Sequence, residues 1–221
     1  PCFGSVTAVA ASPLEIIGKS EKMRRIFKMM GLVCVSRVNV LLQGDTGTGK
    51  ELIARVIHMN SSFKEEPFIV FDCSAVVENL LESELFGHEK GAFTGADTTT
   101  KGKIEQAGNG TLLLDEIAQL PLVVQGKLLG FLQRREYTRV GGSELLKSNC
   151  RIIAACNCDL ADGVNKGIFK EDLFYRLKVF MIEVPPLAER RMDIPLLVEH
   201  FLSKINQELG TRVTKLQEGV M

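Results

Sequence analysis

The sequence has no CxxC pair and no histidine at zinc-ligand spacing from a cysteine, although it contains six cysteines in 221 residues. Cys34, Cys73 and Cys156 lie in apolar stretches, which is typical of free buried thiols in a reducing compartment. Cys156 and Cys158 could supply two metal ligands, but two ligands do not make a zinc site. The cysteine pattern therefore argues against both a disulfide framework and a structural zinc cluster.

The sequence also lacks an excess of either charge and a long apolar run. Lys+Arg and Asp+Glu both total 27, whereas a dedicated nucleic-acid domain usually carries a basic excess. No stretch approaches the roughly 18 apolar residues that a membrane span requires, and the first dozen residues lack the basic start of a signal peptide. We therefore expect a cytoplasmic globular protein without membrane contact.

What the sequence does contain is an alternation of short apolar runs and amphipathic segments. A chain of this length accommodates one α/β domain, or one and a half small ones. Strands alternating with helices predict a parallel sheet with helices on both faces. The expected helices are 20–34, 51–60, 75–85, 121–134 and 193–209, and the expected strands are 38–42, 68–71, 111–114, 151–156 and 179–184.

A few residues and short segments predict where helices begin and where regular structure is interrupted. Ser20 and Asp193 are favourable N-caps for the helices that follow them. Residues 88–100 are rich in glycine and threonine and have almost no periodicity, so we expect an exposed loop there. Residues 137–146 contain a Gly-Gly pair, which predicts a hairpin insertion.

Residues 44–50 have the spacing GxxxxGK between an expected buried strand and an expected helix. Such glycines let backbone N–H groups point at phosphate oxygens, and the lysine would reach the β- and γ-phosphates. The usual Ser or Thr after the lysine is replaced by a glutamate, so Mg²⁺ must rely on other ligands. The candidate nucleotide-binding residues here are Gly44, Thr46, Gly47, Thr48, Gly49, Lys50 and Glu51.

Those other ligands are expected at the end of strand 111–114, where Asp115 and Glu116 follow in sequence. Asp115 is placed to hold Mg²⁺ through water. Glu116 is placed as a general base that polarises the attacking water. An acidic pair at a strand end is common and alone means little, but behind a phosphate loop it favours ATP hydrolysis.

Taken together, these motifs resemble the central AAA+ domain of bacterial enhancer-binding proteins, the activators of sigma-54 RNA polymerase. The resemblance extends from about Ile16 to Phe201, and Glu51 after the lysine is normal in this family. Its most specific part is ESELFGHEKG overlapping GAFTGA at Gly91. The GAFTGA residues are Gly91, Ala92, Phe93, Thr94, Gly95 and Ala96.

The resemblance implies an AAA+ P-loop NTPase with a five-stranded parallel sheet. It also implies ATP and Mg²⁺ as cofactors, and a ring, hexamer or heptamer, with ATP at subunit boundaries. ATP turnover would move the GAFTGA loop against sigma-54 of the polymerase holoenzyme and promote open-complex formation. Phe93 and Thr94 would be the contact residues, although a loop phenylalanine can also be buried. DNA contact would belong to a C-terminal domain that is absent here.

The resemblance also assigns roles to single residues. Asn157 falls at the sensor position, although an asparagine that ends a strand can simply start a turn. Arg176 falls at an arginine-finger position, with an i, i+4 ion pair to Asp172 as the alternative. Ile17 and Gly18 would border the adenine.

Several residues depart from the family pattern. Lys170 replaces a second arginine finger and lacks its planar fork. Asp72 replaces an asparagine that pairs with Glu116, and an aspartate facing Glu116 would repel it or share its proton. Gly130 and Ala188 replace arginines, and Cys156 replaces a threonine. From Asp72 and Lys170 we expect hydrolysis that is weaker than is usual in the family.

The resemblance also divides the chain. We expect 1–14 to be the end of a linker, 15–210 the ATPase core, and 211–221 the start of a truncated helical lid. As a fragment of a larger regulator, the chain is expected to bind nucleotide poorly and to form no stable ring. Two other functions remain open: a nucleotide-dependent assembly module with little turnover, and another AAA+ remodelling motor, against which GAFTGA argues.

Overall fold

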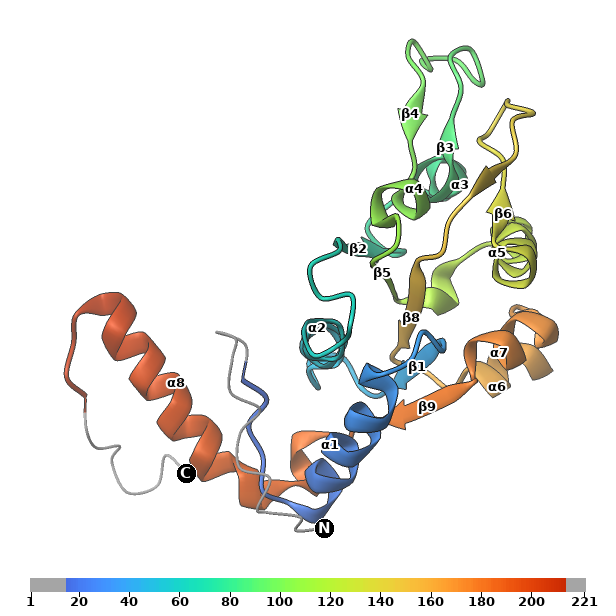
Figure 1. Ribbon diagram of the computed structural model, residues 1–221. Coiled ribbons are helices and arrows are strands. Elements are labelled where there is room, and N and C mark those ends of the chain that lie inside the picture. Colours follow the sequence, from blue (N-terminus) through green and yellow to red (C-terminus); the bar gives the residue numbers. More distant parts are fainter. Residues whose placement is uncertain (1–14, 214–221) are drawn as a thin grey trace.

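The computed structural model describes residues 15–213 and contains a central sheet of five parallel strands (Figure 1). The strands are strongly apolar, as expected for a sheet covered on both faces, and every residue of the longest strand is buried. The expected strands are therefore confirmed to within two residues at each end. Their order in the sheet is β2 (Phe68–Asp72), β5 (Thr111–Asp115), β8 (Arg151–Cys156), β1 (Val40–Gln43) and β9 (Phe180–Glu183).

Helices cover both faces of this sheet. On one face, α1 (Glu21–Cys34) and α2 (Lys50–Met59) contribute Met23, Ile26 and Ile57 to a core with β1 and β9. On the other face, a second core joins the remaining helices of the domain to β5 and β8. These helices are α3 (Glu78–Phe86), α4 (Lys103–Ala107), α5 (Leu122–Arg134), α6 (Leu160–Asn165) and α7 (Glu171–Leu177).

The two predicted N-caps have different outcomes. Ser20 caps α1, and its side chain accepts from the amide of Met23. Asp193 precedes α8 (Ile194–Leu209), but its carboxylate makes no capping hydrogen bond to that helix. It accepts instead from the amides of Lys19 and Ser20 and from the Ser20 hydroxyl, at 2.7, 2.8 and 2.7 Å. Asp193 therefore ties α8 to the start of α1, 173 residues away.

Two small antiparallel ladders rise beyond the sheet (Figure 1). The first pairs β3 (Gly87–His88) with β4 (Thr100–Lys101), and the expected exposed loop lies between them. The second pairs β6 (Glu136–Tyr137) with β7 (Leu146–Lys147), which confirms the predicted hairpin. The five-residue α4 follows β4 directly and was not predicted from the sequence, because so short a helix leaves almost no periodic signal.

The last helix differs from the others because none of its residues is buried. In Figure 1, α8 projects away from the sheet. Among residues 15–213, no helix is long and apolar enough to cross a membrane. The expected linker 1–14 and most of the expected lid start, 214–221, lie outside the described residues.

Candidate nucleotide site and projecting loop

The phosphate loop connects β1 to α2, as the sequence predicted. Gly47 and Gly49 have φ of +80° and +98°, a region that other residues rarely adopt. Gly44 is constrained differently, because a Cβ atom there would lie 2.4 Å from the carbonyl oxygen of Val184. Thr48 closes the turn by donating from its hydroxyl to the carbonyl of Asp45, at 2.7 Å. The chain thus forms a tight loop whose glycines are required by geometry.

The buried side chain of Lys50 stabilises this loop by hydrogen bonds to its backbone. The residue is only 7% exposed. Its ammonium group donates to the carbonyl oxygens of Gly44 and Asp45, at 2.7 and 3.1 Å. A buried lysine at the start of a helix, facing the loop backbone, is the arrangement that binds phosphate oxygens.

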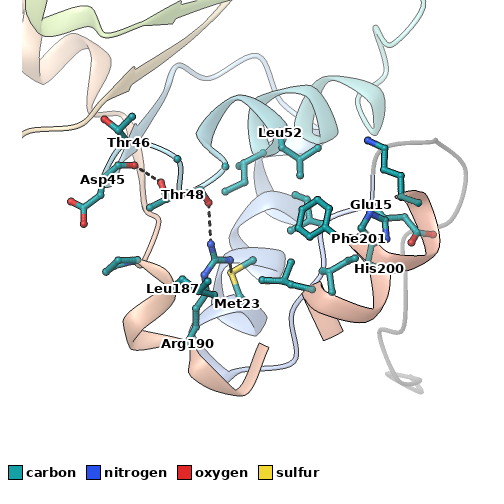
Figure 2. Close-up of a pocket in the computed structure, with 18 residues that line it drawn as sticks. Glu15, Met23, Asp45, Thr46, Thr48, Leu52, Leu187, Arg190, His200 and Phe201 are labelled. Carbon is teal, nitrogen blue, oxygen red and sulfur yellow. Dashed lines mark hydrogen bonds between the residues drawn. The ribbon is translucent and has the colours of Figure 1, made fainter. Parts of the chain in front are cut away.

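A cavity of about 550 Å³ lies beside the phosphate loop (Figure 2). The loop backbone lines one side of it. Ile17 lines it as expected for an adenine contact, whereas Gly18 is not among the lining residues and packs against Met23 instead. Apolar side chains form most of the remaining wall, and Glu15, His200 and Lys204 also line it. The apolar residues are Ile16, Met23, Leu52, Ile53, Leu187, Leu197 and Phe201.

Arg190 lines the same cavity and was not singled out from the sequence. It donates to the carbonyl oxygen of Thr48 at 3.1 Å and contacts the sulfur of Met23 at 3.1 Å (Figure 2). Its Nε is buried and has no hydrogen-bond partner in the described chain. Arg190 therefore links the segment before α8 to the phosphate loop, across 142 residues of sequence.

The acidic pair lies at the same edge of the sheet as the phosphate loop. Asp115 ends β5, and β8 separates β5 from β1, so two strand spacings, about 10 Å, separate the two features. Glu116 follows with φ +49° and ψ +47°, a left-handed conformation that costs a non-glycine residue about 1–2 kcal/mol. Such strain is often found at functional sites.

The surroundings of Glu116 fit a bound water and metal. Its Oε2 atom is buried without a hydrogen-bond partner in the described chain. Burial raises the pKa of the nearby Cys73 thiol, and the charges of Asp72, Asp115 and Glu116 raise it further. No cluster of three or more metal-ligating side chains is present within residues 15–213.

The structure places the remaining predicted residues as follows. Asn157, after β8, donates from Nδ2 to the Thr46 hydroxyl at 3.3 Å, which brings it to the phosphate loop. Arg176 is exposed on α7 and forms no ion pair with Asp172 in the described structure. Lys170 is the N-cap residue of α7, and its amide donates to the Gln125 side chain at 2.8 Å. Both basic residues lie away from this chain's own cavity.

The side chains of Glu51 and Asp72 both bond to neighbours in sequence. Glu51 does not point toward the phosphate loop; its carboxylate pairs with Arg55 one turn later on α2, at 2.7 Å. Asp72 does not pair with Glu116, because its carboxylate accepts from the amide and hydroxyl of Ser74 at 2.8 and 2.7 Å. In the strand register, the partner of Asp72 is Asp115.

The GAFTGA loop forms the tip of the β3–β4 ladder. The amide of Gly91 donates to the carbonyl of Ala96 at 2.8 Å, and that of Ala96 donates to Phe93 at 3.0 Å. Gly91 and Gly95 have φ of +81° and +98°, with open space where a side chain would point. Thr94 is exposed, whereas Ala96 is buried.

The β6–β7 loop supports this tip from the side. The amide of Glu89 donates to the Val140 carbonyl at 3.0 Å, and Val140 in turn donates to Gly87 at 2.9 Å. Arg139 pairs with Glu89 at 2.7 Å and with Glu105 at 2.9 Å. These hydrogen bonds from Arg139, and one from the Thr99 hydroxyl, lower the pKa of Glu89. One arginine therefore joins both loops to α4.

Two glycines lie at the foot of the β3–β4 ladder, where it adjoins α3 and α4. A Cβ atom on Gly87 would lie 2.6 Å from the carbonyl oxygen of Thr100, and one on Gly102 would lie 2.2 Å from the amide of Gly87. Here α3 and α4 meet the ladder with backbone against backbone, so no side chain other than hydrogen fits.

The fold and the site together define a P-loop nucleoside triphosphatase of the AAA+ class. A family model described as "Sigma-54 interaction domain" matches residues 16–183. The chain therefore belongs to the sigma-54 interaction domain family, as the motifs indicated.

Named relatives agree with this assignment. The chain is 54% identical over 194 residues to "Regulatory protein AtoC" of Escherichia coli K12, covering 88% of this chain and 42% of that protein. It is 48% identical over 202 residues to "DNA-binding transcriptional regulator NtrC" of the same strain, covering 91% and 43%. The crystal structure of NtrX from Brucella abortus in complex with ATP matches with a TM-score of 0.87 and 36% identity, covering 93% and 44%. The chain thus spans less than half the length of these relatives.

Proposed function

We propose that this chain is the ATP-hydrolysing core of a sigma-54-dependent transcriptional activator. In the proposal, ATP turnover moves the 91–96 loop, which engages sigma-54 in the polymerase holoenzyme and promotes opening of the promoter complex. The observation that carries the proposal is the placement of GAFTGA at the tip of its own two-stranded ladder, on a core with a complete phosphate loop and acidic pair.

In this proposal, each candidate residue at the edge of the sheet that carries the phosphate loop has one task. The amides of the phosphate loop and Lys50 bind the phosphates of ATP. Asp115 holds Mg²⁺, which neutralises phosphate charge during transfer. Glu116 polarises the attacking water, since its buried Oε2 has no competing hydrogen-bond partner. Asn157 orients that water from the end of β8.

The proposal requires more than one copy of the chain. Arg176 is exposed and away from its own cavity, so it would serve as an arginine finger in a neighbouring subunit, with Lys170 as a weaker second cation. A ring, hexamer or heptamer, in the bacterial cytoplasm provides such neighbours. Contact with DNA is assigned to parts of the regulator outside this chain.

The decisive experiment is capture of sigma-54 by the chain loaded with ADP and a metal fluoride, an analogue of the transition state. We expect Thr94→Ala to abolish capture. Thr98→Ala, which removes an exposed threonine from the same loop but outside GAFTGA, is the matched control and should retain capture. Equal capture by both variants and the unsubstituted chain would remove the loop from its assigned role.

A second function is favoured by one observation. Asp72 and Asp115 are register partners on neighbouring strands. A second carboxylate therefore lies beside the proposed Mg²⁺ ligand, and its negative charge would change the electrostatics of hydrolysis. In that case the chain is a nucleotide-dependent assembly module with little turnover. Phosphate release measured with and without sigma-54 separates the two functions, and Asp72→Asn should raise turnover only if this charge limits it.

A further inference from the structure

Phe93, in the centre of the GAFTGA loop, rests against an aromatic ring of its own ladder. Its ring centroid lies 5.0 Å from that of His88, with an angle of 60° between the ring planes, which is an edge-to-face contact. Phe93 is 37% exposed, although it lies at the tip of a projecting loop. A phenylalanine free of the ladder would be more exposed, so part of its apolar surface is already covered.

His88 is itself held in place from the helix below. Its Nδ1 atom lies 2.7 Å from the hydroxyl oxygen of Ser83 in α3, a residue that is 8% exposed. This hydrogen bond fixes the rotation of the imidazole, and therefore the edge or face that it presents to Phe93. The neighbouring Glu89 does not compete for the ring, because its carboxylate is engaged by Arg139 and Thr99.

We propose that His88 is a positioning residue that holds the Phe93 ring against the ladder, so that the loop is kept docked until the two rings separate. Ser83 orients the imidazole, and α3 thereby has a direct connection to the tip of the loop. Only the identity of the partner that receives Phe93 rests on the proposed function; the docking itself does not.

The expected size of the effect follows from the kind of contact. Edge-to-face aromatic pairs of this sort shift an equilibrium between docked and released forms by about two- to tenfold. Such a contact is strong enough to favour the docked loop, and weak enough for a nucleotide-driven movement of α3 to break it.

The chain offers a clean probe because it contains no tryptophan. In a Phe93→Trp variant, the only indole reports on the tip of the loop, and neither ATP nor sigma-54 is needed for the measurement. With His88 present, we expect a blue-shifted emission and weak quenching by acrylamide. Adding His88→Gln, which keeps a polar side chain but removes the ring, should shift the equilibrium about two- to tenfold toward the released loop, seen as stronger acrylamide quenching and a red-shifted emission.

Two further substitutions separate positioning from general loss of structure. His88→Phe restores a ring without the hydrogen bond to Ser83, and it should return most of the protection that His88→Gln removes. His200→Gln disrupts a histidine–phenylalanine pair elsewhere in the chain, that with Phe201 on α8, and should leave the indole signal unchanged. Thermal unfolding of each variant confirms that the fold is retained.

The result that overturns the proposal is equal quenching in the His88 and His88→Gln backgrounds of Phe93→Trp. A loss of protection in His88→Phe as large as that in His88→Gln would also overturn it, because the ring would then not be what holds the loop. A failure of sigma-54 capture in the Thr94 experiment would leave these fluorescence results unaffected.

Discussion

The phosphate loop and the GAFTGA loop share a backbone feature, a pair of glycines with positive φ, but different contacts hold each loop in place. Each has two glycines with φ between +80° and +98°. In the phosphate loop, a backbone oxygen lies 2.4 Å from where the Cβ of Gly44 would be, and the buried Lys50 and the half-buried Arg190 donate to loop carbonyls. The positive-φ glycines face open space in both loops, but the GAFTGA loop has no closely packed counterpart of Gly44, and its supporting ion pairs are partly exposed.

This difference indicates that glycine content alone does not make a loop mobile. The contacts around the loop decide how firmly it is held: a packed Gly44 and the bonds from Lys50 and Arg190 in the phosphate loop, and partly exposed ion pairs beside the GAFTGA loop. We therefore expect substitutions around the phosphate loop to affect stability and nucleotide chemistry, and substitutions around the GAFTGA loop to affect its position at little cost to the fold.

The largest expected effect lies in the candidate nucleotide site and concerns the hydrolysis step rather than nucleotide binding. Glu116→Gln removes the proposed general base, and we expect phosphate release to fall by roughly 100-fold or more. Nucleotide affinity, measured by calorimetry, should stay nearly unchanged, because the phosphate loop is untouched. Retention of a third or more of the turnover would assign the base to another residue.

The next effect compares glycines directly. Gly44→Ala forces a Cβ atom to within 2.4 Å of the Val184 oxygen, and we expect a loss of about 2–3 kcal/mol of unfolding free energy in urea. Gly47→Ala and Gly91→Ala have similar positive φ and open space, so each should cost about 1 kcal/mol. Of these two, only Gly47→Ala should weaken ATP binding. Equal stability of the Gly44 and Gly47 variants would contradict the packing argument.

A smaller effect concerns the buried link between α1 and α8. Burial alone would raise the pKa of Asp193, but hydrogen bonds from the Ser20 hydroxyl and the amides of Lys19 and Ser20 outweigh it and hold the pKa below its usual value. The stabilisation is therefore present above the unfolded pKa of about 3.9 and is lost as pH falls through the lower folded pKa.

Asp193→Asn tests this link. We expect a loss of about 1–3 kcal/mol at pH 7, the range for hydrogen bonds to a charged group. The gap between the variant and the unsubstituted chain, followed by urea unfolding, should narrow as pH falls toward 3. A gap that does not depend on pH would mean that the charge of Asp193 contributes nothing.

The smallest effect is expected at the loop. Arg139→Ala removes the pairs with Glu89 and Glu105, which are partly exposed and therefore modest in strength. We expect amide hydrogen exchange of residues 89–96 to become about two- to fivefold faster, with little change in global stability. In Arg139→Lys, which keeps the charge but loses the planar guanidinium, the exchange rates should fall between those of the alanine variant and the unsubstituted chain. Exchange that is unchanged in the alanine variant would show that the backbone ladder alone holds the tip.

Local features of the chain were predictable from sequence, and distant contacts were not. The five strands of the sheet, the five longest helices, the phosphate loop, the position of Asp115 and Glu116, and the β6–β7 hairpin follow from short motifs and periodicity, whereas the short helices α4, α6 and α7 were not predicted. The local pairs of Glu51 with Arg55 and of Asp72 with Ser74 were not predicted. A motif records which residue is present but not which neighbour it bonds.

The contacts that were missed altogether join segments far apart in the chain. Asp193 reaches Ser20, and Arg190 reaches Thr48, over more than 140 residues in each case. No pattern in a single sequence identifies such partners. The roles assigned to Asn157, Arg176 and Lys170 remain predictions, because they depend on nucleotide and on a second subunit.

The close backbone contact at Gly87 and Gly102 has a mechanical consequence. Where side chains separate two elements, they can shift between rotamers and absorb a small displacement. At the foot of the β3–β4 ladder there are none, so a displacement of α3 or α4 is passed to the ladder almost undiminished. If ATP turnover moves these helices as proposed, we expect the foot to act as a stiff pivot, so that a small movement near the nucleotide becomes a larger one at Phe93.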